Sequence, residues 1–331
     1  MNEKSRIALI GSGSWATALA KVLLNNVDTL NWYIREPEIR ESITKFHHNP
    51  KYLSSVVFET EKIKLFDDIN KVVEQSDVLL VVVPSAFLSL WMEPFTGSFE
   101  NKYVLSAVKG IIPVTNLTIA EYFNQEFDVS FDQLGVVSGP CHAEEVALER
   151  LSYLTVACKD TEHAKVFAKS LECRYIKTVI SNDIYGIEYA AVLKNIIALA
   201  TGICHGLGYG DNFLAVLISN GYKEIKRFLD KTYASKRKTS NSAYMGDLLV
   251  TCYSQFSRNR TFGTMIGKGY SVKNTMLEMN MVAEGYYAVA CIHEINKKHG
   301  VKMPITDAVY NILYEKMSPS IEMKLLTETL K

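Results

Sequence analysis

The sequence of 331 residues lacks the features that mark several protein classes. It has only six cysteines and no C-x-x-C pair, so neither a disulfide framework nor a zinc site is predicted, and we expect free thiols and no bound metal. Lysine plus arginine equal aspartate plus glutamate at 36 each. Because there is no excess of positive charge, nothing favours binding to nucleic acid or to an anionic membrane.

Segments that would direct the chain into or across a membrane are also missing. The most apolar stretch, residues 78–92, contains Pro84, Ser85 and Ser89 and is too short to span a bilayer. The six residues before the first apolar run leave no room for a signal peptide. We therefore expect a cytoplasmic protein without an integral membrane segment.

What the sequence does contain, at its start, is a strand, a turn and a helix. The apolar run 7–10 predicts a buried parallel strand, and apolar residues at helical spacing follow from Ala16 onwards. Gly11, Gly13 and Ala16 between them give G-x-G-x-x-A, the pattern of a dinucleotide-binding turn. Gly11 would make the tight turn, Gly13 would let backbone approach a pyrophosphate, and the helix N-terminus would attract the phosphates. The alternative interpretation is a purely structural turn.

Strand and helix patterns alternate as far as residue 180 and predict a Rossmann-type doubly wound α/β domain over residues 1–180. Further strands are expected at 29–34, 63–65, 77–85, 103–108, 134–137 and 155–157. Residues 37–62 are interpreted as an insertion of helix and loop, with His47 and His48 on its surface. In such sheets ligands bind outside the carboxyl ends of the strands.

The end of the second strand bears on the choice of nicotinamide cofactor. Arg35 stands there, where an acidic residue would hold the ribose 2′-hydroxyl of NAD and an arginine suits the 2′-phosphate of NADP. Arg35 therefore favours NADP(H). The acidic residue Glu36 follows it directly, however, so NAD(H) also stays a candidate cofactor.

The remainder of the chain, residues 181–331, predicts an all-helical domain. Residues 185–205 are apolar almost all round, which indicates a helix buried in the middle of a domain. Further helices are expected at 211–229, 245–253, 259–267, 283–298 and 304–316. The basic, polar stretch 231–242 predicts an exposed and mobile loop.

Lys194 lies in the middle of the long apolar helix, where burial would be costly unless it is paired and would lower its pKa. It is therefore a candidate proton donor or acceptor; the alternative is a lysine that reaches the domain surface. Asp247, in an apolar surround, is a natural partner. Residues 254–260 gather hydroxyl, guanidinium and amide donors that suit a phosphate, or alternatively form a capped helix with solvated arginines.

Taken in order, these motifs resemble the bacterial NAD(P)-dependent glycerol-3-phosphate dehydrogenase family over nearly the whole chain. The matching stretches are 11–20, 83–85, 109–110, 138–145, 193–195, 206–208, 246–248, 257–260 and 282–285. The resemblance implies reversible reduction of dihydroxyacetone phosphate, a triose phosphate, to sn-glycerol 3-phosphate for phospholipid synthesis. An apolar helical domain is also compatible with a homodimer.

The resemblance implies roles for individual residues. Lys194 would be the catalytic acid/base, which protonates the ketone oxygen during reduction. The substrate would be bound by Lys109, Gly139, Cys141, Asn195, Asp247, Ser257, Arg258 and Asn259. The cofactor, NADP(H) or NAD(H), would be bound by Gly11, Gly13, Ser14, Trp15, Arg35, Lys109, Ala143, Arg258, Val282 and Glu284.

The chain departs from the family pattern at three places. Cys141 stands where the family usually has serine or threonine, Ala190-Ala191 replaces a common Gly-Gly pair, and residues 231–245 form an unusual basic stretch. These departures concern substrate affinity and loop closure rather than the type of reaction.

Two other functions are compatible with parts of the sequence. A dehydrogenase of the 3-hydroxyacid or 6-phosphogluconate type would also use a helix lysine, but it would need its own substrate motif in place of 246–248 and 257–259. A cofactor-binding protein without turnover would explain the glycine turn, yet it gives no reason for Lys194, Asp247 and Arg258 to occur together. Measured turnover distinguishes these functions.

Overall fold

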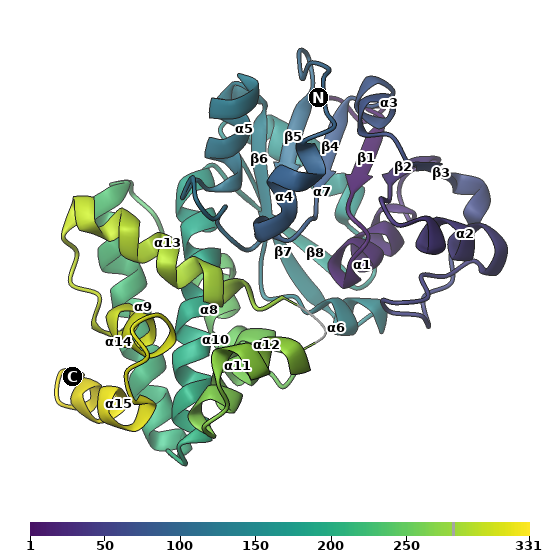
Figure 1. Cartoon of the computed structure of the whole chain (residues 1–331). Coiled ribbons are helices and arrows are strands. Elements are labelled where there is room, and N and C mark those ends of the chain that lie inside the picture. Colours follow the sequence, from purple (N-terminus) through teal and green to yellow (C-terminus); the bar gives the residue numbers. More distant parts are fainter. Residues whose placement is uncertain (280–281) are drawn as a thin grey trace. The chain divides into compact units, whose positions relative to one another are not determined.

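The chain folds into two compact units (Figure 1), as seen in a computed structural model that describes residues 1–279 and 282–331. The sheet unit consists of Met1–Val108 and Ile119–Ile184. The helical unit consists of Lys109–Thr118 and Tyr185–Lys331. The sequence predicts the boundary between residues 180 and 181, slightly before the change of unit after Ile184. It does not predict that Lys109–Thr118 belongs to the helical unit.

The sheet unit contains an 8-stranded sheet in the order β3-β2-β1-β4-β5-β6-β7-β8, which confirms the predicted Rossmann-type architecture. Its strands are β1 (Ile7–Ile10), β2 (Leu30–Tyr33), β3 (Ile63–Phe66), β4 (Val78–Val81), β5 (Tyr103–Ser106), β6 (Leu134–Ser138), β7 (Ser152–Cys158) and β8 (Ile176–Ser181). All neighbours pair in parallel except β6 and β7, which are antiparallel. Strand β8 was not expected from the sequence, because it is a partly exposed edge strand without a continuous apolar run.

Helices cover the sheet on both sides of these strands (Figure 1). They are α1 (Ser14–Leu23), α2 (Pro37–Phe46), η1 (Thr60–Lys62), α3 (Ile69–Glu74), α4 (Ser85–Met92), α5 (Ile119–Phe127), η2 (Phe131–Gln133), α6 (Ala143–Ala147) and α7 (Thr161–Leu171). Alternate residues of β1, Ile7 and Leu9, join buried side chains of α1, α2, α6 and α7 in one core. A separate cluster of tilted and edge-to-face rings joins Phe95 and Phe99 to Phe123 of α5.

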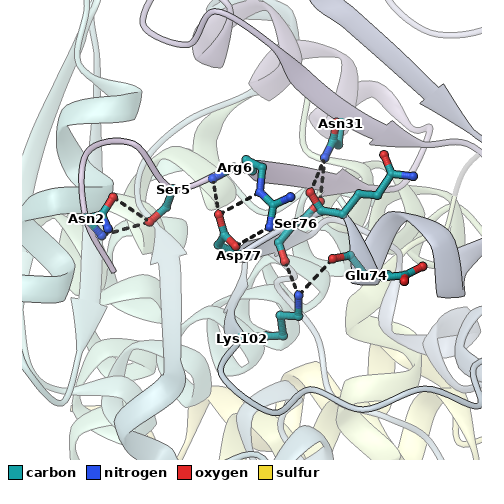
Figure 2. Close-up of polar contacts among 9 residues, drawn as sticks. Asn2, Ser5, Arg6, Asn31, Glu74, Ser76, Asp77 and Lys102 are labelled. Carbon is teal, nitrogen blue, oxygen red and sulfur yellow. Dashed lines mark hydrogen bonds and ion pairs between the residues drawn. The ribbon is translucent and has the colours of Figure 1, made fainter.

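Polar contacts tie the starts of the central strands together (Figure 2). Arg6, just before β1, donates from its backbone and its guanidinium to the Asp77 carboxylate, just before β4. Asn31 Nδ2 in β2 donates to Ser76 Oγ over 2.8 Å, and Lys102 Nζ, before β5, donates to the Ser76 carbonyl over 2.7 Å. This network lies at the amino edge of the sheet, opposite the edge where the glycine turn follows β1.

The helical unit confirms the predicted all-helical C-terminal domain: over residues 185–279 and 282–331 the structure contains helices and no strand. They are α8 (Ile184–Gly206), α9 (Asp211–Thr232), the π-helix η3 (Ser242–Gly246), α10 (Asp247–Tyr253), α11 (Arg258–Gly267), α12 (Val272–Glu278), α13 (Glu284–His299), α14 (Pro304–Leu313) and α15 (Pro319–Thr327). By length and composition α8 could cross a membrane, but its apolar window is 100% buried inside the protein, as in a core helix.

Helices α8 and α11 pack backbone against backbone through glycines. Gly202 and Gly206 on α8 face α11, and Gly263 and Gly267 on α11 face α8. A Cβ atom on any of them would overlap a backbone oxygen of the other helix. The glycines therefore permit a very close approach, which brings α11 against the C-terminal part of α8, residues 199–206.

The basic stretch after α9 is only partly the exposed loop that the sequence predicts. Its residues 233–241 form no helix or strand, as expected. The prediction is wrong at two side chains, however: Arg237 Nη2 donates to the Tyr233 carbonyl over 2.7 Å, and buried Thr239 shares a hydrogen bond of 2.6 Å with the Tyr222 hydroxyl. The segment is held against α9 because the Tyr222 hydroxyl of that helix is within reach of Thr239, and the Leu229 carbonyl accepts a hydrogen bond of 3.3 Å from Arg237 Nη1.

Glu224 on α9 is a buried carboxylate that caps another helix. Its oxygens accept hydrogen bonds from the Ile305 N–H (2.9 Å), the Thr306 N–H (2.9 Å) and the Thr306 hydroxyl (2.7 Å). These N–H groups belong to the first turn of α14, where a helix has no acceptor of its own. Burial raises the pKa of Glu224 from 4.5 to about 7, although the hydrogen bonds from Thr306 and Ile305 oppose this shift.

This raised pKa predicts a pH-dependent contribution to stability. Because the folded-state pKa lies above the unfolded value of 4.5, the folded protein binds the Glu224 proton more tightly and loses stability as the pH rises from 4.5 through about 7. The variant Glu224→Gln cannot ionise. We expect the free energy of unfolding of the wild type, relative to this variant, to fall by roughly 1–3 kcal/mol between pH 5 and pH 8.

Urea unfolding at the two pH values measures this difference. The matched control is Glu294→Gln on α13: Glu294 is exposed, and a hydrogen bond from Lys297 lowers its pKa, so it is already ionised at pH 5. The difference in free energy of unfolding between the wild type and Glu294→Gln should therefore be nearly the same at pH 5 and pH 8. If the free energies of unfolding of the wild type and Glu224→Gln differ by the same amount at pH 5 and at pH 8, Glu224 does not titrate in this range.

Candidate active site

The turn after β1 is held in a conformation that requires glycine. Gly11 has φ +132°, and a Cβ atom there would lie 2.7 Å from the Val82 carbonyl oxygen. Val82 follows β4, which is the neighbour of β1 in the sheet. The close approach therefore occurs where the strand order reverses, the place where doubly wound sheets bind their ligands.

Gly13 opens the N-terminus of α1 to a ligand. It is the N-cap residue with extended backbone (φ −70°, ψ −178°), and among the described residues no side chain caps the helix there. A Cβ atom on Gly13 would meet no atom within 4 Å. Because the first turn of a helix lacks internal acceptors and carries partial positive charge, Gly13, Ser14 and Trp15 fit the pyrophosphate of a dinucleotide.

The other candidate residues of the sheet unit stand at the same edge of the sheet. Arg35 is exposed and follows β2. Gly139, directly after β6, has φ +149°, which favours glycine. Cys141 is buried and its thiol donates to the Tyr153 carbonyl over 3.2 Å, and Ala143 begins α6. The sheet unit thus presents helix starts and strand ends along one edge.

In the helical unit, Lys194 on α8 is buried and forms an ion pair with Asp247, the first residue of α10. Lys109 Nζ lies 3.4 Å from the same carboxylate oxygen, Oδ1. The carbonyl of Lys109 accepts a hydrogen bond of 2.7 Å from Asn195 Nδ2. Residues distant in the sequence, 109, 194–195 and 247, are therefore brought into one polar cluster inside an apolar helical unit.

The electrostatics of this cluster suit proton transfer near neutral pH. Burial lowers the pKa of Lys194 from 10.5 to about 7, the Asp247 carboxylate opposes this shift, and the Lys109 ammonium reinforces it. The nearby thiol of Cys252 is buried and its pKa is raised to about 12, so it stays protonated. Lys194 thus has a proton that is exchangeable in the physiological range.

The start of α11 places three candidate substrate residues. Ser257 is the N-cap and its hydroxyl accepts a hydrogen bond of 3.3 Å from the Arg260 N–H. Arg258 is the first residue of the helix, and Asn259 is buried. Their placement follows from the glycine packing of α11 on α8.

The start of α13 is fixed against the same part of α8. Asn259 Oδ1 accepts a hydrogen bond of 2.9 Å from the Gly285 N–H, and a Cβ atom on Gly285 would lie 2.7 Å from the Asn195 carbonyl oxygen. Glu284 is the first residue of α13, and Val282 lies half-buried just before it. The helical unit therefore gathers Lys109, Asn195, Asn259 and Gly285 around Lys194.

One buried polar residue at the glycine turn was not singled out from the sequence. Asn49 has no exposed surface, although its neighbour His47 is exposed and His48 half-buried. Its side chain contacts the turn between β1 and α1. Hydropathy does not mark it, because it lies in a polar cluster of an irregular segment. Over residues 1–279 and 282–331, no group of three or more His, Cys, Asp or Glu residues is placed to hold a metal ion.

Comparison with known proteins agrees with this architecture. The chain matches the family models for the N-terminus (residues 6–164) and the C-terminus (residues 183–324) of NAD-dependent glycerol-3-phosphate dehydrogenase. A glycerol-3-phosphate dehydrogenase (NAD(P)+) of an Exiguobacterium species is 37% identical over 324 residues, which is 97% of this chain and 95% of that protein. The enzyme of that name from Oceanobacillus iheyensis is 36% identical over 321 residues, 95% of this chain and 91% of its own length.

Solved structures give the same result. The crystal structure of glycerol-3-phosphate dehydrogenase from Coxiella burnetii superimposes with a TM-score of 0.89 at 29% identity, over 98% of this chain and 99% of that one. The resemblance noted in the sequence is thus confirmed. The chain belongs to the NAD-dependent glycerol-3-phosphate dehydrogenase family and is an NAD(P)-dependent oxidoreductase.

Proposed function

We propose that this protein reduces dihydroxyacetone phosphate to sn-glycerol 3-phosphate with NADPH or NADH, and that Lys194 is the acid. The observation that carries the proposal is the buried Lys194–Asp247 pair, in which the pKa of the lysine is lowered to about 7. A group with this pKa gives up and regains a proton readily at neutral pH.

The residues of the helical unit have different roles in the proposed reaction. A bound nicotinamide cofactor would supply the hydride for the reduction. Lys194 Nζ donates its proton to the carbonyl oxygen, which would otherwise carry negative charge in an apolar environment. Asp247 holds the Lys194 ammonium in place, and Lys109 adds a second positive charge 3.4 Å from the same carboxylate oxygen. In the reverse direction, neutral Lys194 accepts the hydroxyl proton.

Binding would use the remaining candidate residues. The cationic Arg258 and Lys109 complement a phosphate, and the fork of an arginine can bind it through two hydrogen bonds. The further substrate contacts we propose are Gly139, Cys141, Asn195, Asp247, Ser257 and Asn259. The proposed cofactor contacts are Gly11, Gly13, Ser14, Trp15, Arg35, Lys109, Ala143, Arg258, Val282 and Glu284. In the cell we place the enzyme in the cytoplasm, as a homodimer that supplies glycerol 3-phosphate for phospholipid synthesis.

The direct test is loss of the nicotinamide absorbance band when the protein is mixed with dihydroxyacetone phosphate and either NADH or NADPH. Oxidation that requires both the ketone and the protein supports the proposed function. Tight binding of the cofactor without oxidation of either form would replace it by the alternative of a cofactor-binding protein without turnover.

Arg35 should set the preference between the two cofactors. Because a guanidinium pairs with a 2′-phosphate but has no such partner in NADH, Arg35→Ser should raise the KM for NADPH about tenfold and that for NADH much less. Initial rates at varied cofactor concentration measure both constants. Lys45→Ser, which removes an exposed cation from α2, is the matched control. An equal change for both cofactors would remove Arg35 from the 2′-phosphate site.

A further inference from the structure

The side chain of Asn49 forms four hydrogen bonds, two to residues of the turn and helix that follow β1 and two to residues of its own loop. Its Nδ2 donates to the Ser12 carbonyl over 2.9 Å and to the Thr17 hydroxyl over 3.0 Å. Its Oδ1 accepts from the N–H groups of Lys51 (3.0 Å) and Tyr52 (3.2 Å). An amide has two N–H donors and one oxygen with two lone pairs, so every position is occupied.

These contacts fix the direction in which the turn presents its amides. In a trans peptide the C=O and the following N–H point in opposite directions. Because Asn49 holds the Ser12 carbonyl, the Gly13 N–H of the same peptide is turned away from Asn49. The Thr17 hydroxyl accepts from Asn49 and donates to the Gly13 carbonyl over 3.0 Å, which fixes the next peptide as well. Asn49 thus contacts the first of the two peptides that flank Gly13 directly and the second through the Thr17 hydroxyl.

The loop that carries Asn49 is itself held in place at both ends. His47 and Leu53 adopt left-handed backbone conformations, with φ 61° and 52°, which are rare for residues other than glycine. Such conformations persist where surrounding contacts determine them, and they cluster at functional sites. Here the contacts are the hydrogen bonds from the Phe58 N–H to the His47 carbonyl and from the Val56 N–H to the Leu53 carbonyl, both 2.8 Å, and those that Asn49 accepts from Lys51 and Tyr52.

We propose that Asn49 is a positioning residue for the dinucleotide, which acts through the Ser12 carbonyl and Thr17 to aim the amides around Gly13 at the pyrophosphate. This inference rests on the proposed role of Gly11 and Gly13 in cofactor binding. Asn49 takes no part in proton transfer, so its loss weakens cofactor binding and leaves the chemical step unchanged.

The experiment compares variants in a binding assay without turnover. The dissociation constants of NADH and NADPH are measured from nicotinamide fluorescence in the absence of ketone. Asn49→Ala should raise them about tenfold, because two donors that aim the turn are lost. Thr17→Val should have an effect of the same kind, and Thr17→Ser, which keeps the hydroxyl, should restore binding. In steady-state assays the KM for cofactor should rise while kcat and the KM for dihydroxyacetone phosphate stay within about twofold.

Two controls separate this inference from its alternatives. Asn31→Ala removes another buried asparagine of the same sheet unit, one that donates to Ser76 at the amino edge (Figure 2), and should lower the melting temperature without changing cofactor affinity. Gly13→Val fills open space at the turn and should abolish cofactor binding. If Gly13→Val binds cofactor normally, the proposed cofactor site itself is wrong. If Gly13→Val fails to bind but Asn49→Ala and Thr17→Val behave like Asn31→Ala, Asn49 has only a structural role.

Discussion

Replacement of Lys194 by methionine should lower kcat for the reduction of dihydroxyacetone phosphate by about a thousandfold, the scale of general acid catalysis. Methionine has a similar length and no exchangeable proton, so the apolar surroundings of α8 stay filled. The Asp247 carboxylate keeps a cationic neighbour, because Lys109 Nζ lies 3.4 Å from it. We therefore expect a folded variant that binds NADH and NADPH nearly as the wild type does.

The measurements are kcat from the nicotinamide absorbance and cofactor affinity from nicotinamide fluorescence. Lys226→Met is the matched control: it makes the same substitution on α9, at an exposed lysine paired with Asp230, and should leave kcat unchanged. Activity of Lys194→Met within about tenfold of the wild type would assign the proton to another group.

The same lysine should govern the pH profile of the wild type. Reduction needs protonated Lys194 and the reverse oxidation needs neutral Lys194, whose pKa is about 7. The kcat/KM for reduction should therefore fall as the pH rises through about 7, and that for oxidation should rise over the same range. In Lys194→Met the residual activity should lose this inflection.

The second large effect concerns stability: Gly202→Ala should lower the free energy of unfolding by about 3 kcal/mol or more. A Cβ atom on Gly202 would overlap the backbone carbonyl of Arg260 and approach the Thr264 nitrogen within 2.9 Å, so α11 must move away from α8. The higher helix propensity of alanine, about 1 kcal/mol, offsets only part of this cost.

Urea unfolding of the variant measures this loss. Gly210→Ala is the matched control, because its Cβ would meet nothing within 4 Å and its φ of −82° is ordinary for alanine. It should cost at most about 1 kcal/mol, the loss of a favourable N-cap residue. Equal effects of the two substitutions would mean that α8 and α11 separate easily.

Much of the fold could be predicted from the sequence because its signals are local. The buried strand 7–10 and the helix around Lys194 follow from continuous apolar runs, and the glycine turn follows from its motif; the structure has β1, α1 and α8 at these places. Strand β8 could not be predicted in this way. It forms through its pairing with β7, and its own sequence is a short, partly exposed one in which Lys177 and Thr178 interrupt the apolar residues.

At the site, the residue types could be predicted from the sequence, but not which of these residues contact one another. A buried lysine demands an anionic partner, and Asp247 was the natural candidate, yet only the fold brings the two together. Asn49 illustrates the opposite case. Its proposed role rests on contacts with residues more than thirty positions away, Ser12 and Thr17, and no local pattern encodes them. Polar residues that act through backbone carbonyls of distant segments leave no periodic signal.

The path of the chain between the two units has a consequence for how the protein can be divided. The backbone crosses from one unit to the other after Val108, after Thr118 and after Ile184, so neither unit is a single continuous segment. A fragment that begins at Tyr185 would lack Lys109, whose carbonyl accepts the hydrogen bond from Asn195. The two halves are therefore not interchangeable modules, and a chimera joined at one point would pair one parent's Lys109–Thr118 with the other parent's helices.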